Sequence, residues 1–561
     1  MTGPARGPDV ALTADLWWRN AVIYCLDVET FADSDGDGVG DFPGLTGKID
    51  YLAGLGVTCL WLMPFYPTAD RDDGYDVTDH YAIDPRLGTF GDFTEFMRTA
   101  RDRGLRVIVD LVVNHTSREH AWFQAARRSP QSRYHEYYVW RDEIPADGPE
   151  GVVFPGRQDG VWTFEPEAGQ YYLHRFYSHQ PDLDVTSPAV REEIHKILGF
   201  WLAQGIAGFR VDAVPFLLET AGPVESDRLD GHGFLRDLRA FLSRRSGEAI
   251  LLGEVNLPAD EQRRFFGDED GDELHLLFDF LVMQATWLAL ARGDARPLVR
   301  AWQARRPIPP AASWASFLRN HDELTLDQLT PSEREEVFAA FGPRADMQVY
   351  GRGLRRRLPP MLGNDPAWIR MAYSLMFALP ATPTLFYGEE LGMGENLAVD
   401  DRLAVRTPMQ WNRGPAAGFT SAPPDALVRP VPDAPFSPDD VNAGDQRADP
   451  DSLLNWFERL IRLRKECPEV AWGTTELLAT AADTVVVFAH RWRGRTLITA
   501  HNLGRRSRRI EIPWPDQDDG TLRDLLRHDG DVTVEAGRIR LRLERHDHRW
   551  LRFEPSRAGA Q

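Results

Sequence analysis

The chain has 561 residues, of which 43% are hydrophobic, and 85 acidic side chains outnumber 64 basic ones to give a net charge of −21. A chain of this sign repels phosphate, so the composition argues against a nucleic-acid or anionic membrane surface and favours a neutral or cationic small ligand. The three widely spaced cysteines, Cys25, Cys59 and Cys467, argue against a disulfide framework and favour a reducing compartment.

The amino terminus lacks a cationic start followed by an apolar run, and no later stretch reaches the roughly 18 apolar residues of a membrane span. We therefore expect a cytoplasmic protein without a membrane segment. Residues 1–15 carry Gly, Pro and Asp without periodicity and predict a loose tail.

Beyond the tail, short apolar runs alternate with helical patterns. Eight such runs lie at 21–27, 57–63, 105–111, 206–212, 249–254, 274–280, 313–319 and 382–388. The helical patterns between them include 44–56, 91–104, 188–205 and 365–379. Buried parallel strands read as continuous apolar runs, and eight strand–helix repeats are typical of an α/β fold, the (β/α)8 or TIM barrel.

Two segments depart from this alternation of strands and helices. An aromatic-rich stretch interrupts the third repeat, and after residue 470 the pattern changes to alternating strands at 484–490, 496–502, 508–514 and 538–544. The expected domains are a barrel (domain A) at 16–115 and 183–470, an inserted domain B at 116–182, and an antiparallel β-sandwich (domain C) at 471–561. The Pro-, Asp- and Ala-rich stretch 413–450 predicts an irregular loop that covers the barrel mouth.

Polar residues stand at the carboxyl ends of three predicted barrel strands, where the active sites of TIM barrels lie. Arg210 and Asp212 end the fourth strand on the same face, Glu254 ends the fifth, and Asp322 follows the seventh. A single acidic residue at such a place often only caps the next helix, but three together form an acid–base set. Such a set suits glycoside chemistry, in which one carboxylate attacks the anomeric carbon and a second protonates the leaving oxygen.

The chain contains, in this order, the motifs DLVVNH (110–115), QPDLD (180–184), GFRVDA (208–213), GEV (253–255) and RNHDE (319–323). They resemble the motif set of the α-amylase family, glycoside hydrolase family 13, and the resemblance extends from about residue 16 to the end of the chain. It implies that Asp212 is the nucleophile, Glu254 the general acid/base, and Asp322 the stabiliser that holds sugar hydroxyls. The partners of these carboxylates would be Arg210, His115 and His321.

The segment RDDGYD (71–76) resembles the family's sugar-stacking element, which implies that Tyr75 forms a platform under the sugar ring. Members that act on chain ends pair an aspartate with an arginine of RTPMQW, here Asp72 and Arg406. That pair implies a pocket for a small α-glucoside such as maltose. The small Ala213 after the nucleophile is typical of members that prefer α-1,4 to α-1,6 bonds.

Further stretches, such as RNHDELTL (319–326) and VRTPMQW (405–411), resemble those of family members that convert maltose to trehalose. In that reaction the leaving glucose stays enclosed, turns, and attacks the covalent intermediate through its own anomeric hydroxyl. RQDGVWT (157–163) and residues 255–257 depart from those members where the leaving sugar would bind, so glucose and water both stay open as acceptors. The alternative is a hydrolytic exo-acting α-1,4-glucosidase. A further alternative is an inactive protein, like the family's members that serve as transporter heavy chains. Such a protein would lack the three carboxylates, which this chain retains.

Two calcium sites are expected, and no organic cofactor. The loop DSDGDGVGD (33–41) offers hard oxygen donors at alternate positions, as Ca²⁺ prefers, although a plain acidic turn is the alternative. Its candidate ligands are Asp33, Asp35, Asp37, the Val39 carbonyl and Asp41. By resemblance, the ligands of a second calcium would be Asn114, Asp182, Glu219 and the main-chain oxygens of Phe216 and Leu217.

One protein partner is implied by the resemblance. The chain shows no kinase-like extension after its β domain, and for maltose-to-trehalose members of this kind a separate maltokinase is the implied partner. A homo-oligomer is left open, and no nucleic-acid or membrane partner is expected.

Overall fold

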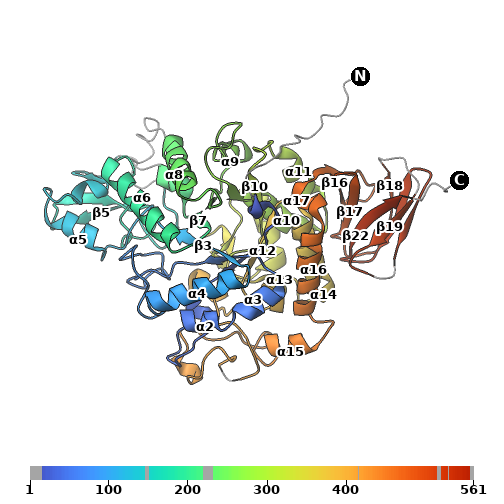
Figure 1. The fold of residues 1–561 in the computed structure, drawn as a ribbon, viewed down its shortest axis with the longest axis horizontal. Helices are drawn as coiled ribbons and strands as arrows, with labels where there is room; N and C mark the ends of the chain where they lie inside the picture. Colours follow the sequence, from blue (N-terminus) through green and yellow to red (C-terminus); the bar gives the residue numbers. More distant parts are fainter. Residues whose placement is uncertain are drawn as a thin grey trace.

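The structure is a computed structural model that describes residues 16–145, 151–218, 231–414, 416–514, 520–527 and 530–555. Its centre is a closed parallel barrel with strand order β1-β14-β10-β9-β8-β7-β3-β2, which confirms the predicted TIM barrel (Figure 1). The strands are β1 (Ile23–Leu26), β2 (Cys59–Leu62), β3 (Arg106–Leu111), β7 (Gly208–Val211), β8 (Ile250–Gly253), β9 (Leu276–Phe278), β10 (Ser313–Ser316) and β14 (Thr382–Phe386). Each lies within one of the eight predicted apolar runs.

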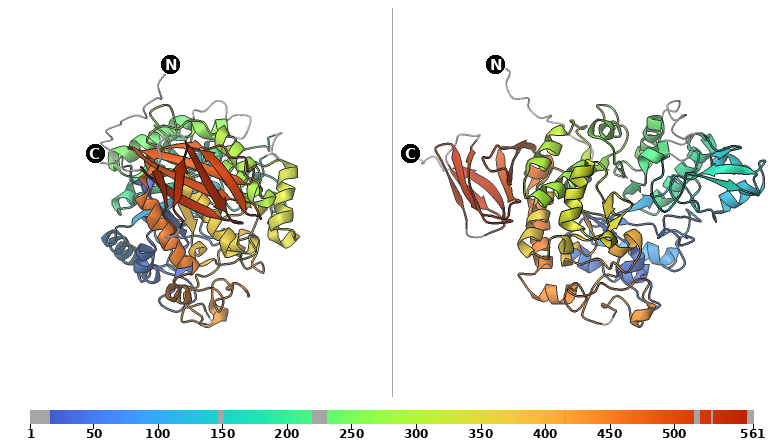
Figure 2. Two further views of the ribbon diagram at one scale, coloured as in Figure 1. Left: turned by 90° about the vertical axis from the view of Figure 1, so that its right-hand side faces the viewer. Right: turned by 180° about the vertical axis from the view of Figure 1, so that it is seen from behind.

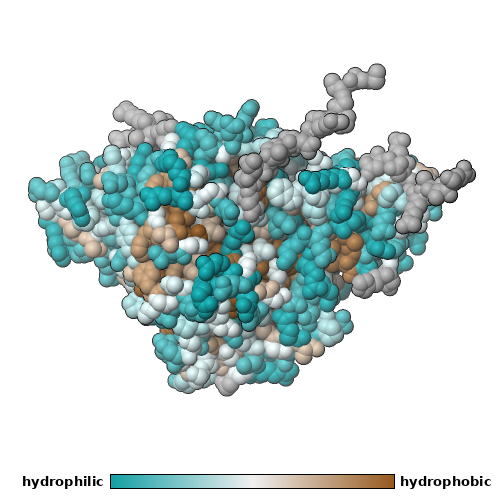
Figure 3. All heavy atoms as spheres, viewed as in Figure 1, coloured by the Kyte–Doolittle hydropathy of each residue, from teal (hydrophilic) through white to brown (hydrophobic). Residues whose placement is uncertain are grey.

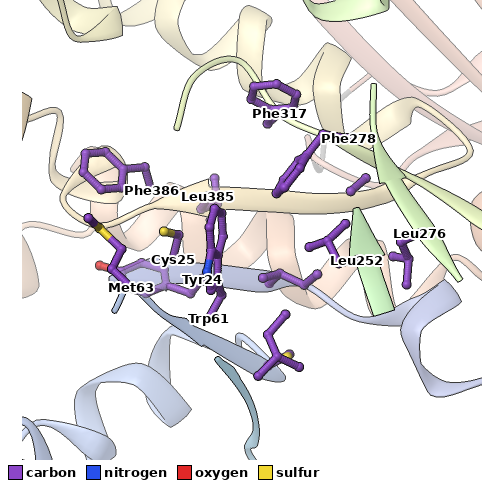
Figure 4. Packing of buried hydrophobic residues seen from close by; sticks show 14 of the residues in the cluster. Tyr24, Cys25, Trp61, Met63, Leu252, Leu276, Phe278, Phe317, Leu385 and Phe386 are labelled. Atoms are coloured by element: carbon purple, nitrogen blue, oxygen red, sulfur yellow. The ribbon is translucent and has the colours of Figure 1, made fainter. Parts of the chain in front are cut away.

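Large apolar side chains fill the barrel. Figure 4 shows Trp61, Leu252, Phe278 and Leu385 side by side from four different strands, and all four are fully buried. Burying one such side chain contributes roughly 1.5–3 kcal/mol, which explains why every barrel strand reads as an apolar run. Trp61 also donates its indole N–H to Asp110 Oδ2 at 2.8 Å, so the core holds a carboxylate at the carboxyl end of β3.

Helices surround the barrel. They include α2 (Phe42–Thr46), α3 (Ile49–Leu55), α4 (Phe90–Asp102), α6 (Pro188–Ala203), α8 (Gly231–Arg245), α10 (Phe280–Arg292), α11 (Arg296–Ala304), α14 (Pro366–Ala378) and α16 (Leu453–Glu466). Three of the four predicted helices are confirmed as single helices. The fourth, predicted at 44–56, is two short helices, because α2 already begins at Phe42 after its cap Asp41, and Lys48, with φ −105° and ψ 1°, interrupts the helical backbone before α3.

A small domain follows β3, as predicted for domain B. It contains α5 (Ala121–Arg128) and a three-stranded antiparallel sheet of β4 (Trp140–Arg141), β6 (Gln170–Leu173) and β5 (Trp162–Glu165). Glu165 is fully buried there and accepts from Arg118 at 2.6 Å and from Arg127 at 2.7 Å. These contacts tie its hairpin to the chain that leaves the barrel. The domain stands at one end of the molecule in Figures 1 and 2.

Two features near the barrel mouth differ from the prediction. A second small sheet, of β11 (Leu324–Thr325), β13 (Gly353–Leu354) and β12 (Gln348–Val349), was not expected. The stretch 413–450 was predicted to be an irregular loop that covers the mouth, and none of its described residues lines the pocket that contains Asp212 and Glu254. It packs instead against the loop after β1, where Asp33 N donates to Phe419 O and Val428 N to Gly38 O, both at 2.9 Å.

The C-terminal domain lies at the opposite end of the molecule from domain B (Figure 2). Its described residues form one antiparallel sheet with strand order β15-β16-β17-β22-β19-β20-β21-β18, curled around its own apolar core. The four predicted strands correspond to β16 (Val485–Trp492), β17 (Arg495–Asn502), β18 (Arg508–Pro513) and β21 (Arg538–Leu543). The strands that the pattern missed are β15 (Thr474–Leu477), β19 (Gly520–Asp524), β20 (Val532–Glu535) and β22 (His548–Pro555).

Within the described part of the chain, no helix combines the length and the apolar character that crossing a membrane requires. The face in Figure 3 is covered mostly by hydrophilic residues, with smaller apolar areas between them.

Candidate active site

Arg210 joins three carboxylates at the carboxyl ends of β3, β7 and β8. Its Nη1 donates to Asp110 Oδ1 and to Asp212 Oδ1, both at 2.6 Å, and its Nη2 donates to Glu254 Oε2 at 2.5 Å. The guanidinium is fully buried, so these contacts form where water screens them little. The structure thus brings the predicted nucleophile and the predicted acid/base together on one cation.

Asp322 stands opposite this group and is held by three basic side chains. His321 Nε2 lies 3.1 Å from Asp322 Oδ2, and Arg402 Nη1 and Arg406 Nη2 contact Asp322 Oδ1 at 2.7 and 3.1 Å. Asp322 also lines the pocket that contains Asp212 and Glu254. Its carboxylate is therefore fixed in orientation and open to a ligand.

Tyr75 and His115 lie on the same side of the pocket. The Tyr75 hydroxyl is 2.7 Å from His321 Nε2, and the two rings are parallel with centroids 5.6 Å apart. His115 Nε2 is 3.1 Å from the Tyr75 carbonyl. Arg210 and Arg402 both lie near the Tyr75 ring, each with its guanidinium carbon 5.9 Å from the ring centroid. These contacts fix the ring as a rigid wall of the pocket.

The predicted pairing of Asp72 with Arg406 is wrong. Asp72 Oδ1 accepts from Arg402 Nη2 at 2.6 Å, whereas Arg406 bonds the neighbouring Asp73. Asp73 has φ +53° and is followed by Gly74 at φ +91°, so the chain turns sharply between the two aspartates. Arg402 lies in a 3-10 helix (Asp401–Val405) just before the RTPMQW motif. The partner of Asp72 is therefore Arg402, four residues before Arg406, the arginine predicted from the motif.

The pocket has a volume of about 210 Å³ and combines carboxylates with aromatic walls. Phe154 and Phe176 come from domain B, and Phe216 from the short helix α7 (Val214–Leu218) after β7. Phe154 stacks on Tyr177 and touches Tyr350, which lies next to β12. The sequence showed that domain B is aromatic, but only the fold shows which rings face the carboxylates.

A cluster of polar side chains that was not predicted from the sequence lies beside the predicted acid/base. Asn256 Nδ2 donates to Asp327 Oδ1 at 2.8 Å and to Asp327 Oδ2 at 3.0 Å, and both residues line the pocket. Fully buried Gln284 donates to both side chains at 3.3 Å. Because Asn256 follows Glu254 by two residues, this group lies beside the predicted acid/base.

Burial and neighbouring charges separate the acidities of the three carboxylates. Burial, opposed by the charge of Arg210 and supported by that of Asp212, raises the pKa of Glu254 to about 7. Burial, opposed by Arg210 and supported by Asp110, raises the pKa of Asp212 to about 6. For Asp322, burial is outweighed by His321 and the two arginines, which hold the pKa well below its usual value. Near neutral pH, Glu254 keeps a proton more readily than Asp212.

Ala213 has φ +49°, a left-handed conformation that β-branched residues adopt only at considerable cost. Its N–H donates to Glu254 Oε2 at 3.3 Å, and it lines the pocket. The small residue after the predicted nucleophile thus suits both the backbone and the space beside the acid/base.

The acidic loop after β1 fits a hard cation in part. Asp33, Asp35 and Asp37 place carboxylate oxygens within 4.8 Å of one another, which is the donor chemistry that Ca²⁺ takes. Val39 donates its N–H to Asp37 Oδ1 at 2.8 Å. Asp41 is occupied elsewhere, because its oxygens accept from Gly44 N at 2.6 Å and from Ser34 N and Oγ at 2.9 Å.

The second proposed calcium set fits less well. Asp182 Oδ1 accepts from Asn114 Nδ2 at 3.4 Å and from Arg175 N at 3.2 Å, and Glu219 lies outside the described residues. Burial raises the pKa of Asp182 to about 7, and the charge of buried Arg175 opposes that rise. Phe216 and Leu217 belong to α7, and the Phe216 ring packs on Phe176. A cationic side chain beside Asp182 repels a second cation there.

Comparisons with known proteins agree with this site. A model of the α-amylase catalytic domain matches residues 25–337 and 355–473. The trehalose synthase of Thermus thermophilus is 40% identical over 97% of this chain, and the chain spans 56% of that protein's length. The trehalose synthase/amylase of Mycobacterium tuberculosis is 38% identical, with 99% of this chain and 93% of that protein covered. Glucan 1,6-α-glucosidase of Streptococcus pneumoniae is 30% identical over 88% of this chain and 93% of its own length.

Solved structures share the whole architecture. An α-amylase from H. orenii superposes with a TM-score of 0.74 at 27% identity and covers 95% of this chain and 99% of its own. Since a family model matches most of the barrel and relatives around 40% identical extend over nearly the full chain, the protein belongs to the α-amylase family.

Proposed function

We propose that the protein converts maltose to trehalose by transferring a glucosyl group through a covalent ester of Asp212. The observation that carries this is Arg210, which binds Asp212 and Glu254 on its two terminal nitrogens beside the pocket that both carboxylates line. Such closeness suits a retaining enzyme, whose two carboxyl groups stand about 5 to 5.5 Å apart. The trehalose synthase relatives support this substrate over that of the more distant glucosidases.

In the first step, a carboxylate oxygen of Asp212 attacks the anomeric carbon of the non-reducing glucose. The bond from that carbon to the glycosidic oxygen breaks, and Glu254 gives its proton to the oxygen as the second glucose leaves. Asp322 accepts hydrogen bonds from hydroxyls of the first sugar as positive charge develops on the ring. Asp72 and Arg402 close the pocket beyond that sugar.

In the second step, ester formation removes the negative charge of Asp212 that raises the pKa of Glu254. Glu254 then becomes a better base and takes the proton from the anomeric hydroxyl of the retained glucose. That oxygen attacks the anomeric carbon of the glucosyl group bound to Asp212, the bond from that carbon to the Asp212 oxygen breaks, and trehalose forms with the Asp212 carboxylate restored. Water in place of glucose would give hydrolysis.

Proton NMR of purified protein with maltose tests the proposal. We expect trehalose to accumulate with little free glucose, because the aromatic walls and the polar group around Asp327 retain the leaving sugar. Glucose as the sole product would instead support the exo-acting α-1,4-glucosidase.

Asp327 supplies a prediction about retention. In Asp327→Asn, one carboxylate oxygen that faces the leaving sugar becomes an amide donor, although Asn256 and Gln284 still contact the side chain. We expect the glucose-to-trehalose ratio to rise about 10-fold, equivalent to a loss of about 1.4 kcal/mol in holding the acceptor. Product ratios by NMR measure this, and Glu335→Gln, an exposed acidic residue, is the control. An unchanged ratio would contradict a role for Asp327 in retention.

The pH profile follows from the two acidities. Asp212 must be ionised, so kcat/KM falls as pH drops through about 6, and Glu254 must be protonated, so it falls as pH rises through about 7. We expect a bell-shaped profile with its maximum between these values, whose two apparent pKa values belong to the coupled pair. Initial rates with maltose across the pH range measure it. An activity that keeps rising through the alkaline range would contradict the assignment of Glu254 as the acid.

We propose calcium only at Asp33, Asp35 and Asp37, where it would act on stability and take no part in the transfer. Saturation with the ion at 100 times its Kd would contribute about 2.7 kcal/mol to the free energy of unfolding. We expect inductively coupled plasma analysis to find calcium in dialysed protein, and a chelator to lower the unfolding temperature. Asp35→Asn should abolish that chelator effect, and protein without calcium would contradict the site.

We also propose a cellular setting for the protein. All three cysteines are free and buried, which supports a reducing, cytoplasmic location. A separate maltokinase and a homo-oligomer are kept as proposals. Co-purification from the source cells and analytical ultracentrifugation test them, and recovery of the protein without a kinase would count against the first.

A further inference from the structure

Arg429 is a buried cation in the segment 416–442, beside the loop that follows β1. Its Nη2 donates to Glu29 Oε2 at 2.9 Å, and its Nη1 donates to Asp27 Oδ2 at 3.4 Å and to the main-chain oxygen of Arg406 at 3.3 Å. It also contacts Asp73 Oδ1. None of these five residues lines the pocket, so the group lies behind the wall that faces the substrate.

A chain of charged contacts connects this group with the pocket. Asp73 is shared, since its Oδ1 accepts from Arg429 and its Oδ2 from Arg406. Arg406 in turn donates Nη2 to Asp322 Oδ1 at 3.1 Å and Nε to the His321 carbonyl at 2.9 Å. The orientation of Asp322 therefore depends on Arg406, and that of Arg406 depends on Asp73.

Arg429 is the cation that contacts all three buried carboxylates of this group, those of Asp27, Glu29 and Asp73. Asp27, Glu29 and Asp73 place carboxylate oxygens within 4.8 Å of one another, and their side chains are at most 8% exposed. Arg86 contacts Glu29 at 2.9 Å, but its side chain is 36% exposed. Removing the cation that contacts all three would leave three buried carboxylates with only Arg406 on Asp73 and the partly exposed Arg86 on Glu29, which is unfavourable.

The segment that carries Arg429 is held against the loop that follows β1. Val428 donates its N–H to the Gly38 carbonyl at 2.9 Å. Gly38 has φ +96°, and a Cβ at that position would lie 1.9 Å from the Ala426 carbonyl oxygen. The close approach thus requires glycine, and it delivers Arg429 to Asp73 from a part of the chain remote from the barrel strands.

We propose that Arg429 is a positioning residue for glucosyl transfer, which fixes Asp73 so that Arg406 holds Asp322 in place against the sugar. The inference rests on the proposed function for the role of Asp322. Because the bonds of Asp322 to sugar hydroxyls strengthen in the transition state, loss of Arg429 should lower kcat more than it raises KM.

The test uses the full chain and α-glucosyl fluoride, whose leaving group needs no proton, so that fluoride release reports the first transfer step. We expect Arg429→Gln to lower kcat about 10- to 100-fold, as for a small misplacement of a group at the reacting sugar, with KM little changed. Arg413→Gln is the matched control, because Arg413 lies in the adjoining chain with a 67% exposed side chain that pairs with Asp445 at 2.7 Å. It should behave like wild type.

A double-mutant cycle separates positioning from a general loss of stability. If Arg429 acts through Asp73, Arg429→Gln combined with Asp73→Asn should lose no more activity than the worse single variant. Arg429→Lys, which retains the charge but cannot reach Asp73, Glu29 and the Arg406 carbonyl together, replaces Arg429→Gln if that variant does not fold. It should also show a lowered kcat.

Wild-type kcat in Arg429→Gln or Arg429→Lys, or losses that add fully in the double variant, would overturn the inference. Asp212→Asn distinguishes that failure from failure of the proposed function. If Asp212→Asn releases no fluoride while the Arg429 variants match wild type, only the positioning role is wrong. If Asp212→Asn still releases fluoride, the proposed mechanism is wrong.

Discussion

Asp212→Asn is expected to lower kcat/KM for maltose by at least about 10⁴-fold, because the amide oxygen is a poor nucleophile and no ester forms. The fold should be retained, since Arg210 keeps its contacts to Asp110 and Glu254. NMR of maltose consumption measures the loss, and circular dichroism checks the fold.

The identity of the nucleophile can be tested further with Asp212→Gly, which leaves space beside the anomeric carbon. Azide should then attack α-glucosyl fluoride from the side that Asp212 occupied and give β-glucosyl azide. Glu335→Gln, a change at an exposed residue outside the pocket, is the control and should release fluoride at the wild-type rate. Residual maltose turnover above about a thousandth of wild type in Asp212→Asn would contradict the covalent role, because loss of an essential nucleophile removes more than that.

Glu254→Gln is expected to have the second large effect on activity. Maltose has a poor leaving group that requires a proton, so we expect a loss of about 10² to 10⁴-fold on maltose. Glucosyl fluoride needs no proton, and its first step should be largely retained. The alkaline limb of the pH profile should also vanish, because Glu254, whose pKa is raised to about 7, is the group that titrates there.

Comparing maltose with glucosyl fluoride tests whether Glu254 is the acid. Asp110→Asn is the comparison, since Asp110 is also bound to Arg210 but does not line the pocket. It should not discriminate between maltose and the fluoride. Equal losses on both substrates in Glu254→Gln would show that Glu254 acts through structure and not as an acid.

The barrel could be predicted from the sequence because its strands are buried on both faces. Each of the eight apolar runs contains one barrel strand, since continuous burial leaves a continuous apolar signal. The signal fails where polar and apolar residues mix over short lengths. Strands such as β12 (Gln348–Val349) and β15 (Thr474–Leu477) are short or exposed, and no periodicity marks them.

The site could be predicted only in part. The motifs led to Asp212, Glu254 and Asp322, which stand at strand ends and are fixed by the barrel. Pairings made by loops were harder. Arg402 and Arg406 are one helical turn apart, and the left-handed backbone at Asp73 decides which arginine meets Asp72. Spacing along the chain carries no information on such a turn.

The most direct test of the central claim is an isotope experiment. Maltose labelled with ¹³C in both glucose units is incubated with the protein and excess unlabelled glucose, and the trehalose formed is examined by NMR and mass spectrometry. If the leaving glucose is retained in the pocket, the trehalose should carry the label in both units. Trehalose labelled in one unit only would show exchange with free glucose, and labelled glucose without trehalose would contradict the proposed function.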